Sequence, residues 1–190
     1  MNREEQKHQT RQRIVQAAVR GFRRGGFGGL GVDGLAKEAG VTSGAFYVHF
    51  DSKTDAFRAA VTQGMTELRD GVKGCQEQHG KAWWPEFVRF YLGFKRTCDL
   101  SESCGLQSLS PEVARADAAA HAAFEAGLRE VASAIVEGPR SPGAPKDLAA
   151  AYAALSMLVG AVTVARAVDN VTTSEQIADA AGRLLLGARW

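Results

Sequence analysis

Apolar residues near the start of the chain recur at the spacing of an amphipathic helix. Between Thr10 and Arg24 they stand three or four positions apart, and arginines occupy the remaining faces. The glycine-rich stretch 25–31 should break this helix, because glycine costs a helix interior about 1 kcal/mol relative to alanine. A second helix is expected from about Val32, and Gly40 can take the left-handed conformation that ends a helix.

The segment "VTSGAFYVHFDSK", residues 41–53, has the composition of a strand, since Phe, Tyr and Val all favour β-structure. A single strand at this place would leave its backbone groups unpaired, whereas a short helix after a glycine-containing turn completes a helix-turn-helix unit. Helical spacing puts Phe46 and Phe50 together as core anchors. Tyr47 and Val48 then lie outside, so we predict a helix with an exposed contact face.

Every strong segment beyond this unit also has a helical pattern. A fourth helix follows the cap-like residues 51–53, and a loop with three prolines, residues 138–146, separates two long helices. The remaining predicted helices cover residues 81–97, 111–138, 147–169 and 174–188. No segment shows convincing β-alternation, so the sequence predicts an all-α chain of about nine helices.

Composition and charge indicate a cytoplasmic protein. Of 190 residues, 45% are hydrophobic and 23% are charged, which is ordinary for a soluble domain. The N-terminus is charged without the apolar stretch of a signal peptide, and no apolar run looks long enough to span a bilayer, so we expect no membrane partner. Residues 1–58 hold ten Lys/Arg against six Asp/Glu, leaving thirteen against fifteen elsewhere, a bias that suits a polyanion partner for the first third.

The reactive residue types do not form a catalytic or metal-binding pattern. Three cysteines without a secretory signal are expected to be free thiols. The four histidines fall in unrelated segments, and none has a partner at zinc-ligand spacing. A Cys104–His121 pair would act in catalysis only if both lined one cavity. We therefore expect no enzyme, no metal and no cofactor.

The stretch "TRQRIVQAAVRGFRRGGFGGLGVDGLAKEAGVTSGAFYVHFDSKTDAFRAAV", residues 10–61, resembles the DNA-binding domain of TetR/AcrR-family transcriptional regulators. This resemblance implies an N-terminal three-helix domain, residues 1–52, which inserts its third helix into the major groove. It also implies a helical inducer-binding and dimerisation domain, residues 53–190. The expected function is a homodimeric repressor that binds a palindromic operator on double-stranded DNA and is released by a small hydrophobic or electrophilic inducer.

The resemblance also implies which residues face DNA, with Lys53 holding a phosphate. The other expected contacts are Thr42, Ser43, Gly44, Ala45, Tyr47 and Val48. For His49, contact with DNA and a structural hydrogen bond remain equal alternatives. Leu30 and Gly31 stand where the family often has a hydroxyl, so DNA binding is either weaker or compensated by basic residues ahead of the first helix. Those residues are Arg3, Lys7, Arg11 and Arg13.

The predicted helix 81–97 has too much aromatic surface for one narrow stripe. A filled core would explain this surface, whereas the family resemblance favours an inducer pocket with aromatic walls. The residues expected to bind the inducer are Trp84, Phe87, Tyr91, Phe94, Cys104 and Phe124. A helical small-molecule-binding protein without a DNA function remains a more distant alternative.

Cys104 is also a candidate redox or electrophile sensor. Ser103 resembles the N-cap of a short helix, which would put Cys104 in the first turn, where the helix dipole favours the thiolate. Some proteins of the family sense oxidants through a cysteine, and Cys98 would resolve an oxidised Cys104 if the turn brought them together. The alternative is an inert buried thiol.

The last two predicted helices carry many small residues, which let helices approach closely. Two such helices from each of two subunits would form a bundle around a two-fold axis. That symmetry implies a palindromic operator whose half-sites are spaced by whole helical turns of DNA.

Overall fold

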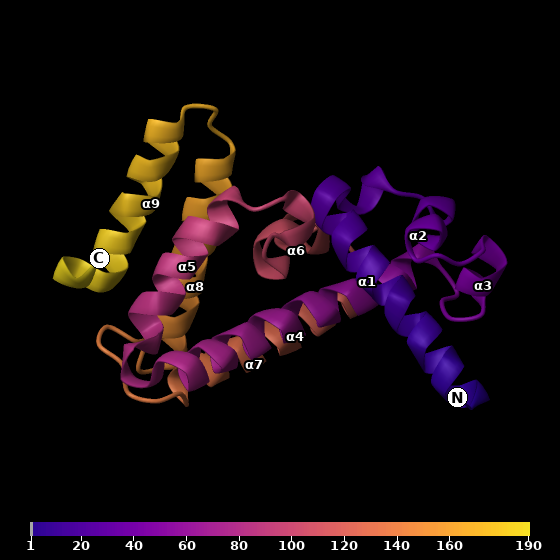
Figure 1. Ribbon diagram of the computed structural model, residues 1–190, viewed down its shortest axis with the longest axis horizontal. Coiled ribbons are helices and arrows are strands. Elements are labelled where there is room, and N and C mark those ends of the chain that lie inside the picture. Colours follow the sequence, from indigo (N-terminus) through magenta and orange to yellow (C-terminus); the bar gives the residue numbers. More distant parts are fainter. Residues whose placement is uncertain (1) are drawn as a thin grey trace. The chain divides into compact units, whose positions relative to one another are not determined.

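The computed structural model describes residues 2–190, which form helices joined by turns and contain no strand in that range (Figure 1). The all-α prediction is confirmed. The α-helices are α1 (Arg3–Gly29), α2 (Val32–Glu38), α3 (Ser43–Tyr47), α4 (Lys53–His79), α5 (Trp83–Thr97), α6 (Gly105–Val113), α7 (Ala118–Val136), α8 (Leu148–Arg166) and α9 (Val171–Leu186).

The described chain packs as two compact units. The first unit contains the residues up to Met65 together with Leu100–Ala126, and the second contains Thr66–Asp99 and Gly127–Trp190. Helices α4 and α7 therefore contribute residues to both units. The division after residue 52 concerns function and stays a prediction.

Helix α1 begins earlier than its apolar pattern indicated. The Asn2 side chain accepts the backbone N–H groups of Glu4 and Glu5, and the Glu5 carboxylate accepts the Asn2 N–H at 2.8 Å, which forms a capping box. The basic residues at 3, 7, 11 and 13 thus lie within the helix, and the prediction that they precede it was wrong. The predicted break is confirmed at Gly26, whose φ of 65° interrupts the helix before its last short turn.

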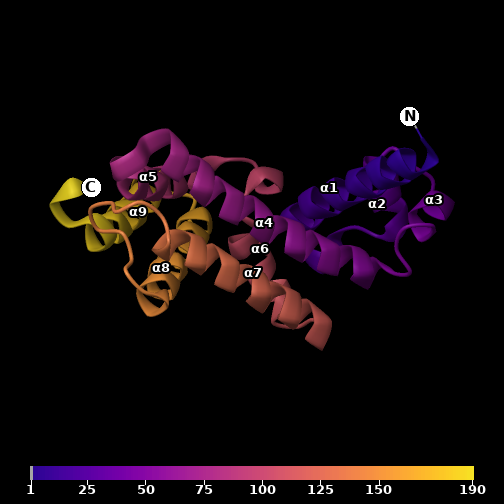
Figure 2. The ribbon, with the colours of Figure 1, turned by 90° about the horizontal axis from the view of Figure 1, so that it is seen from below.

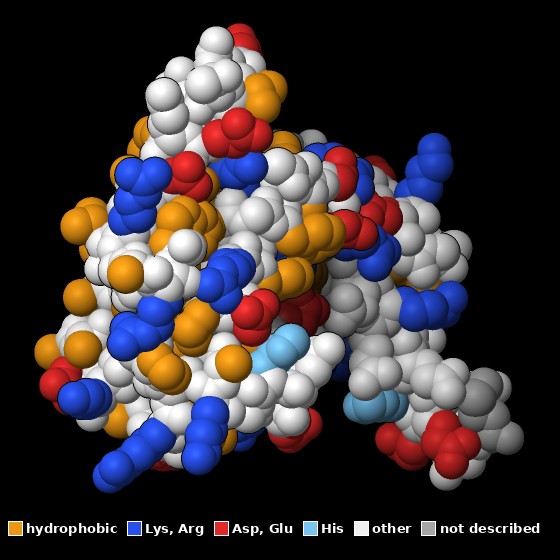
Figure 3. Space-filling view, turned by 60° about the vertical axis from the view of Figure 1, so that its left-hand side comes forward, with side chains coloured by type: hydrophobic (Ala, Val, Ile, Leu, Met, Phe, Trp, Pro, Cys, Tyr) orange, Lys and Arg blue, Asp and Glu red, His pale blue; other side chains and the backbone are white. Residues whose placement is uncertain are grey.

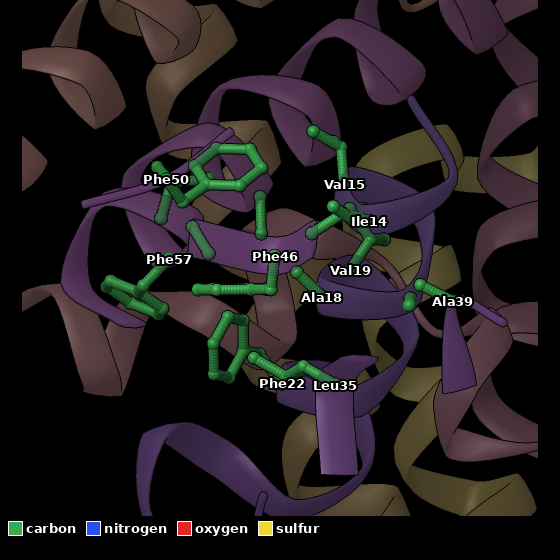
Figure 4. Close-up of a cluster of buried hydrophobic side chains, with 14 of the residues drawn as sticks. Ile14, Val15, Ala18, Val19, Phe22, Leu35, Ala39, Phe46, Phe50 and Phe57 are labelled. Carbon is green, nitrogen blue, oxygen red and sulfur yellow. The ribbon is translucent and has the colours of Figure 1, made fainter. Parts of the chain in front are cut away.

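The core of the first unit forms where α1, α2, α3 and α4 meet. Phe22 of α1 lies edge-on to Phe57 of α4, with ring centroids 5.3 Å apart. Phe46 of α3 is fully buried among side chains from α1 and α4 (Figure 4). Each buried large apolar side chain stabilises the fold by roughly 1.5–3 kcal/mol, so this cluster holds α2 and α3 on α1.

The sequence prediction was wrong at two points around α6. The N-cap of α6 is Cys104, and Ser103 lies outside the helix with its hydroxyl donating to the Leu100 carbonyl at 2.5 Å. The predicted single helix over 111–138 is interrupted by a turn at 114–117. Asp117 ends that turn, because its carboxylate accepts the N–H of Ala120 at 2.9 Å and so caps the next helix.

Asp117 also joins the turn before α7 to α4. Arg58 donates to its carboxylate through Nη2 at 2.6 Å and Nε at 3.2 Å, and Arg58 also contacts Asp55 at 2.5 Å. The hydrogen bond from Arg58, followed by that from the Ala120 N–H, lowers the pKa of Asp117 to about 2. The carboxylate therefore stays ionised, and this ion pair is kept, throughout the physiological pH range.

In the second unit, α5 packs against both α8 and α9, which also pack on each other (Figure 1). Arg166 near the end of α8 donates to the carbonyls of Lys95 at 2.9 Å and Cys98 at 2.8 Å. These carbonyls lie at the C-terminal end of α5, where the helix leaves acceptors without an internal donor. Arg166 thus caps α5 from a neighbouring helix.

Helix α8 is apolar on its outside as well as in the core. Residues 148–165 carry no charge, and the helix is long and apolar enough to cross a membrane by length and composition alone, so the statement that no run reaches that length was wrong. Val164 of this helix is 52% exposed. Figure 3 shows hydrophobic side chains at the surface between charged ones.

Helices α4 and α6 approach each other closely where Gly64 faces Gly105. A Cβ at Gly105 would lie 2.8 Å from Cα of Gly64, so either backbone must move to admit it. We expect Gly105→Ala to lower the free energy of unfolding by about 1–3 kcal/mol, the usual cost of overpacking. Urea denaturation followed by circular dichroism measures this.

Gly71 in α4 is the matched control, because a Cβ there meets no atom within 4 Å. Gly71→Ala should raise stability by up to about 1 kcal/mol through helix propensity. Equal effects of the two substitutions would contradict the close approach of α4 and α6.

Candidate nucleic-acid interface and aromatic row

Within residues 41–53, Ser43–Tyr47 form the short helix α3 that the periodicity predicted, and no strand is present there. The Thr42 hydroxyl oxygen caps α3 by accepting the Ala45 N–H at 3.1 Å. Phe46 is fully buried and Phe50 is 4% exposed, with ring centroids 5.6 Å apart. Both predicted anchors are confirmed, and they hold one face of this short helix on the core.

The turn before α3 has the predicted geometry as well. Gly40 takes a φ of 67°, the left-handed conformation that glycine accepts without a Cβ clash. Its N–H donates to the Lys37 carbonyl, and the N–H of Val41 donates to the Ala36 carbonyl at 2.9 Å. These bonds use the last carbonyls of α2 and direct the chain into α3.

The outer face of α3 is open. Tyr47 is 56% exposed and Val48 is 68% exposed, Thr42 and Gly44 are exposed, and Ala45 is half-buried. Helix α3 lies at the edge of the group formed with α1 and α2 (Figure 2). The structure therefore brings the predicted contact residues of α3 onto one accessible surface.

Two predicted polar contacts have partners inside the first unit. The Ser43 hydroxyl donates to the carboxylate of Asp33 at 2.5 Å. The Lys53 ammonium lies 4.6 Å from the ring centroid of Phe27, in a cation–π contact. Asp33 was missed by sequence reasoning, because ten residues separate it from Ser43 and only the turn at Gly40 brings them together.

Basic residues of α1 border the C-terminal end of α3. The Arg11 guanidinium lies 5.0 Å from the ring centroid of Phe50. His49 is half-buried, and burial, followed by the positive charges of Lys7 and Arg11, lowers its pKa. Burial and the two neighbouring cations therefore disfavour the charged form of His49, and the positive charge of this border comes from Lys7 and Arg11 of α1.

The start of α2 lacks a side-chain anchor, as predicted. Its N-cap is Gly31, which supplies no side-chain hydrogen bond to the helix. The hydroxyl that would serve both as a cap and as a contact is therefore absent from this end of the candidate interface.

Three of the six residues predicted to bind an inducer form a row along α5. The rings of Trp84 and Phe87 stack at 5.9 Å, and Phe87 lies 5.9 Å from Tyr91, all three being buried in the second unit. Phe94 instead is 46% exposed and stacks on Phe90. Cys104 and Phe124 belong to the first unit.

Neighbouring tryptophans in this region have different hydrogen bonding. Trp83 Nε1 donates to the Pro139 carbonyl at 2.8 Å. Trp84 Nε1 is equally buried and has no acceptor among residues 2–190. A buried N–H without an acceptor is costly, so Trp84 offers a donor that a bound molecule would satisfy.

The cysteines differ in their surroundings. Cys104 is 5% exposed at the N-cap of α6, and its predicted place in the first turn was wrong. Cys98 is half-buried, with its Sγ 3.1 Å from an Arg166 nitrogen. A sensing role for either thiol stays a hypothesis. Within residues 2–190, no His, Cys, Asp and Glu side chains gather in a group able to hold a metal ion.

Comparison with known sequences finds matches for the N-terminal part of the chain. Residues 14–60 match the profile of the family described as "Bacterial regulatory proteins, tetR family". The HTH-type transcriptional regulator SrpR of Pseudomonas putida is 42% identical over 53 residues, which are 28% of this chain and 25% of SrpR. The chain spans between 23% and 40% of the length of the curated relatives it matches.

Comparison with solved structures covers nearly the whole chain. The reduced form of Escherichia coli NemR aligns with a TM-score of 0.74 at 18% identity, over 94% of this chain and 98% of NemR. The multidrug binding protein EbrR in complex with proflavin aligns with a TM-score of 0.60 at 23% identity, over 92% and 99% of the two chains. The two comparisons agree: residues 14–60 are similar to the TetR family of bacterial regulatory proteins, and the chain shares the fold of these solved structures.

Proposed function

We propose that this protein is a cytoplasmic, ligand-responsive transcriptional regulator that binds DNA through residues 1–52 and binds an inducer and a second subunit through residues 53–190. The observation that carries this proposal is α3, which is anchored by two buried phenylalanines and presents its opposite face to solvent. It acts as a repressor, and inducer binding releases it from its operator.

Helix α3 suits insertion into the major groove of DNA, which is wide enough to admit a helix. Tyr47 and Val48 offer apolar contact to thymine methyl groups, and the Tyr47 hydroxyl reaches toward a phosphate. Lys53 binds a phosphate after leaving the ring of Phe27, and Lys7 and Arg11 of α1 contribute further positive charge. Phosphate contacts of this kind make the affinity fall steeply with salt.

Tyr47→Ala tests this surface, because it removes the largest exposed side chain of α3 and leaves the anchors in place. We expect operator affinity to fall by about tenfold or more, given the 1–3 kcal/mol of a good base or phosphate contact. The measurement is a gel-shift titration at fixed salt with duplexes selected from random DNA.

Tyr47→Phe is the matched control, since it keeps the ring and removes only the hydroxyl. It separates apolar contact from a phosphate hydrogen bond. Wild-type affinity in Tyr47→Ala would exclude α3 as the recognition helix.

The row of Trp84, Phe87 and Tyr91 is the proposed inducer-binding region. Buried aromatic rings, of which Trp84 and Phe87 are stacked, suit a planar hydrophobic molecule, and the Trp84 N–H suits one that also carries a hydrogen-bond acceptor. EbrR in complex with proflavin is an example of this fold with a planar aromatic ligand. Acridone, which is planar and has an acceptor carbonyl, is therefore an appropriate probe.

Trp84→Phe removes the N–H and keeps an aromatic ring. We expect it to weaken acridone binding by about threefold to tenfold, which corresponds to one net hydrogen bond. Fluorescence titration measures the affinity, and release of operator DNA in the same titration measures the response.

The control is Trp83→Phe, because Trp83 Nε1 already donates to the Pro139 carbonyl. That substitution should lower stability and leave acridone affinity unchanged. If the two substitutions weakened binding equally, Trp84 would have no special role.

A second copy of the chain is the proposed partner of the outer face of α8. Small residues recur there at one-turn spacing, namely Ala153, Ser156, Gly160 and Thr163. A two-fold bundle of α8 and α9 would bury this apolar face against protein, so no contact with lipid is proposed. The same two-fold axis requires a palindromic operator.

Gly160→Leu tests the dimer. A Cβ at this position meets no atom of its own chain within 4 Å, so a larger side chain obstructs only a partner. We expect the variant to be monomeric at micromolar concentration by light scattering after size exclusion, with an unchanged helical spectrum.

Gly71→Leu is the control, since Gly71 is equally open but lies on α4. This variant should stay dimeric. A dimeric Gly160→Leu protein would place the interface on another face.

A further inference from the structure

Asp33 and Ser43 form a polar pair that joins the start of α2 to the start of α3. Ser43 is the first residue of α3, and Asp33 lies in the first turn of α2. The Ser43 Oγ and Asp33 Oδ1 atoms are 2.5 Å apart, and the bond is exposed to solvent. An acidic side chain at this place is unexpected for a surface that binds a polyanion.

The hydrogen-bond donors and acceptors that remain available on the pair determine which groups it can recognise. A serine hydroxyl has one hydrogen and two lone pairs, and an ionised carboxylate has lone pairs only. The hydrogen in this bond must therefore come from Ser43, which then has none left to donate. Every remaining site on both side chains is an acceptor.

Thr42, the preceding residue, has the opposite arrangement. Its oxygen accepts the Ala45 N–H at 3.1 Å, so the hydroxyl hydrogen remains available to an outside acceptor. Two adjacent hydroxyls thus present different chemistry. Thr42 can donate to a phosphate oxygen, whereas Ser43 cannot.

We propose that Ser43 and Asp33 together read an exocyclic amino group, the N4 of cytosine or the N6 of adenine, on the major-groove edge of one base pair. These amines are the hydrogen donors in that groove, whereas guanine O6 and N7 and thymine O4 are acceptors. The carboxylate repels phosphate and the acceptor edges, so the pair contributes base specificity instead of general affinity. This inference rests on the proposed DNA-binding function.

The pair fits the shortage of polar contacts on the rest of α3. Ala45 and Val48 offer only apolar contact, and Gly44 has no side chain. With the Ser43 hydrogen committed to Asp33, discrimination by hydrogen bonding at the start of α3 depends on two side chains from two helices. Neither is sufficient alone. Ser43 without Asp33 can rotate and donate to the wrong base, and Asp33 without Ser43 loses the hydrogen bond that holds its exposed carboxylate in place.

Selection of bound sequences from random duplexes tests the proposal, with wild type, Ser43→Ala, Asp33→Ala and the double variant compared at one salt concentration. We expect the wild-type profile to contain one position per half-site with about tenfold preference for an amine-bearing base. Each single substitution should remove that preference and leave the others. The double variant should lose no more than either single variant, because the two residues act as one unit.

The dependence of affinity on salt separates this role from general electrostatics. Phosphate contacts determine that slope, so it should be equal in all four proteins. Thermal melting verifies that each variant is folded. If Asp33→Ala does not fold, the result for Ser43→Ala decides the test. Wild-type base preferences in both single variants would show that Ser43 and Asp33 do not recognise a base together. The proposed DNA-binding function would be unaffected by that result. A wild-type protein that selects no duplex would overturn the proposed function, and this inference with it.

Discussion

The burial of Phe46 and Phe50 is the constraint on which the candidate DNA-binding surface depends. Helix α3 has five residues and is far too short to be stable by its own hydrogen bonds. Its stability comes from the ring of Phe46 in the helix and the ring of Phe50 just after it, both packed on the core formed with α1 and α4. The same register forces Tyr47 and Val48 outward, so one packing interaction both stabilises the helix and creates its contact face.

The surroundings of α3 follow from how α1 and α2 end. The capping box at Asn2 extends α1 toward the N-terminus, and this places Lys7 and Arg11 beside the far end of α3. The left-handed turn at Gly40 brings the start of α2 next to the start of α3, and with it the carboxylate of Asp33. The surface is thus basic along one border and offers acceptors at the other, which a simple count of charges in the first third does not reveal.

The second unit is held by polar groups that satisfy helix ends and by closely packed aromatic rings. Arg166 caps α5, and the Trp83 N–H is bonded to a loop carbonyl. The N–H of Trp84 is an exception to the rule that buried donors are hydrogen-bonded. The open small-residue face of α8 is an exception to the rule that apolar faces are covered. Such exceptions are expected where a protein binds a ligand or another subunit.

The sequence by itself determined the helical class, the break in the glycine stretch, the turn at Gly40 and the two anchors of α3, because all of these depend on periodicity and on local backbone preferences. It did not predict the start of α1, the turn at 114–117 or the N-cap at Cys104, where capping side chains and the contact of Asp117 with Arg58 decide the boundaries. Only the tertiary structure shows that Ser43 is hydrogen-bonded to Asp33. It alone also shows that the Trp83 N–H has an acceptor and the Trp84 N–H has none among residues 2–190. The partners in such hydrogen bonds lie on different helices or on distant loops. The spacing of residues along the chain therefore does not predict them.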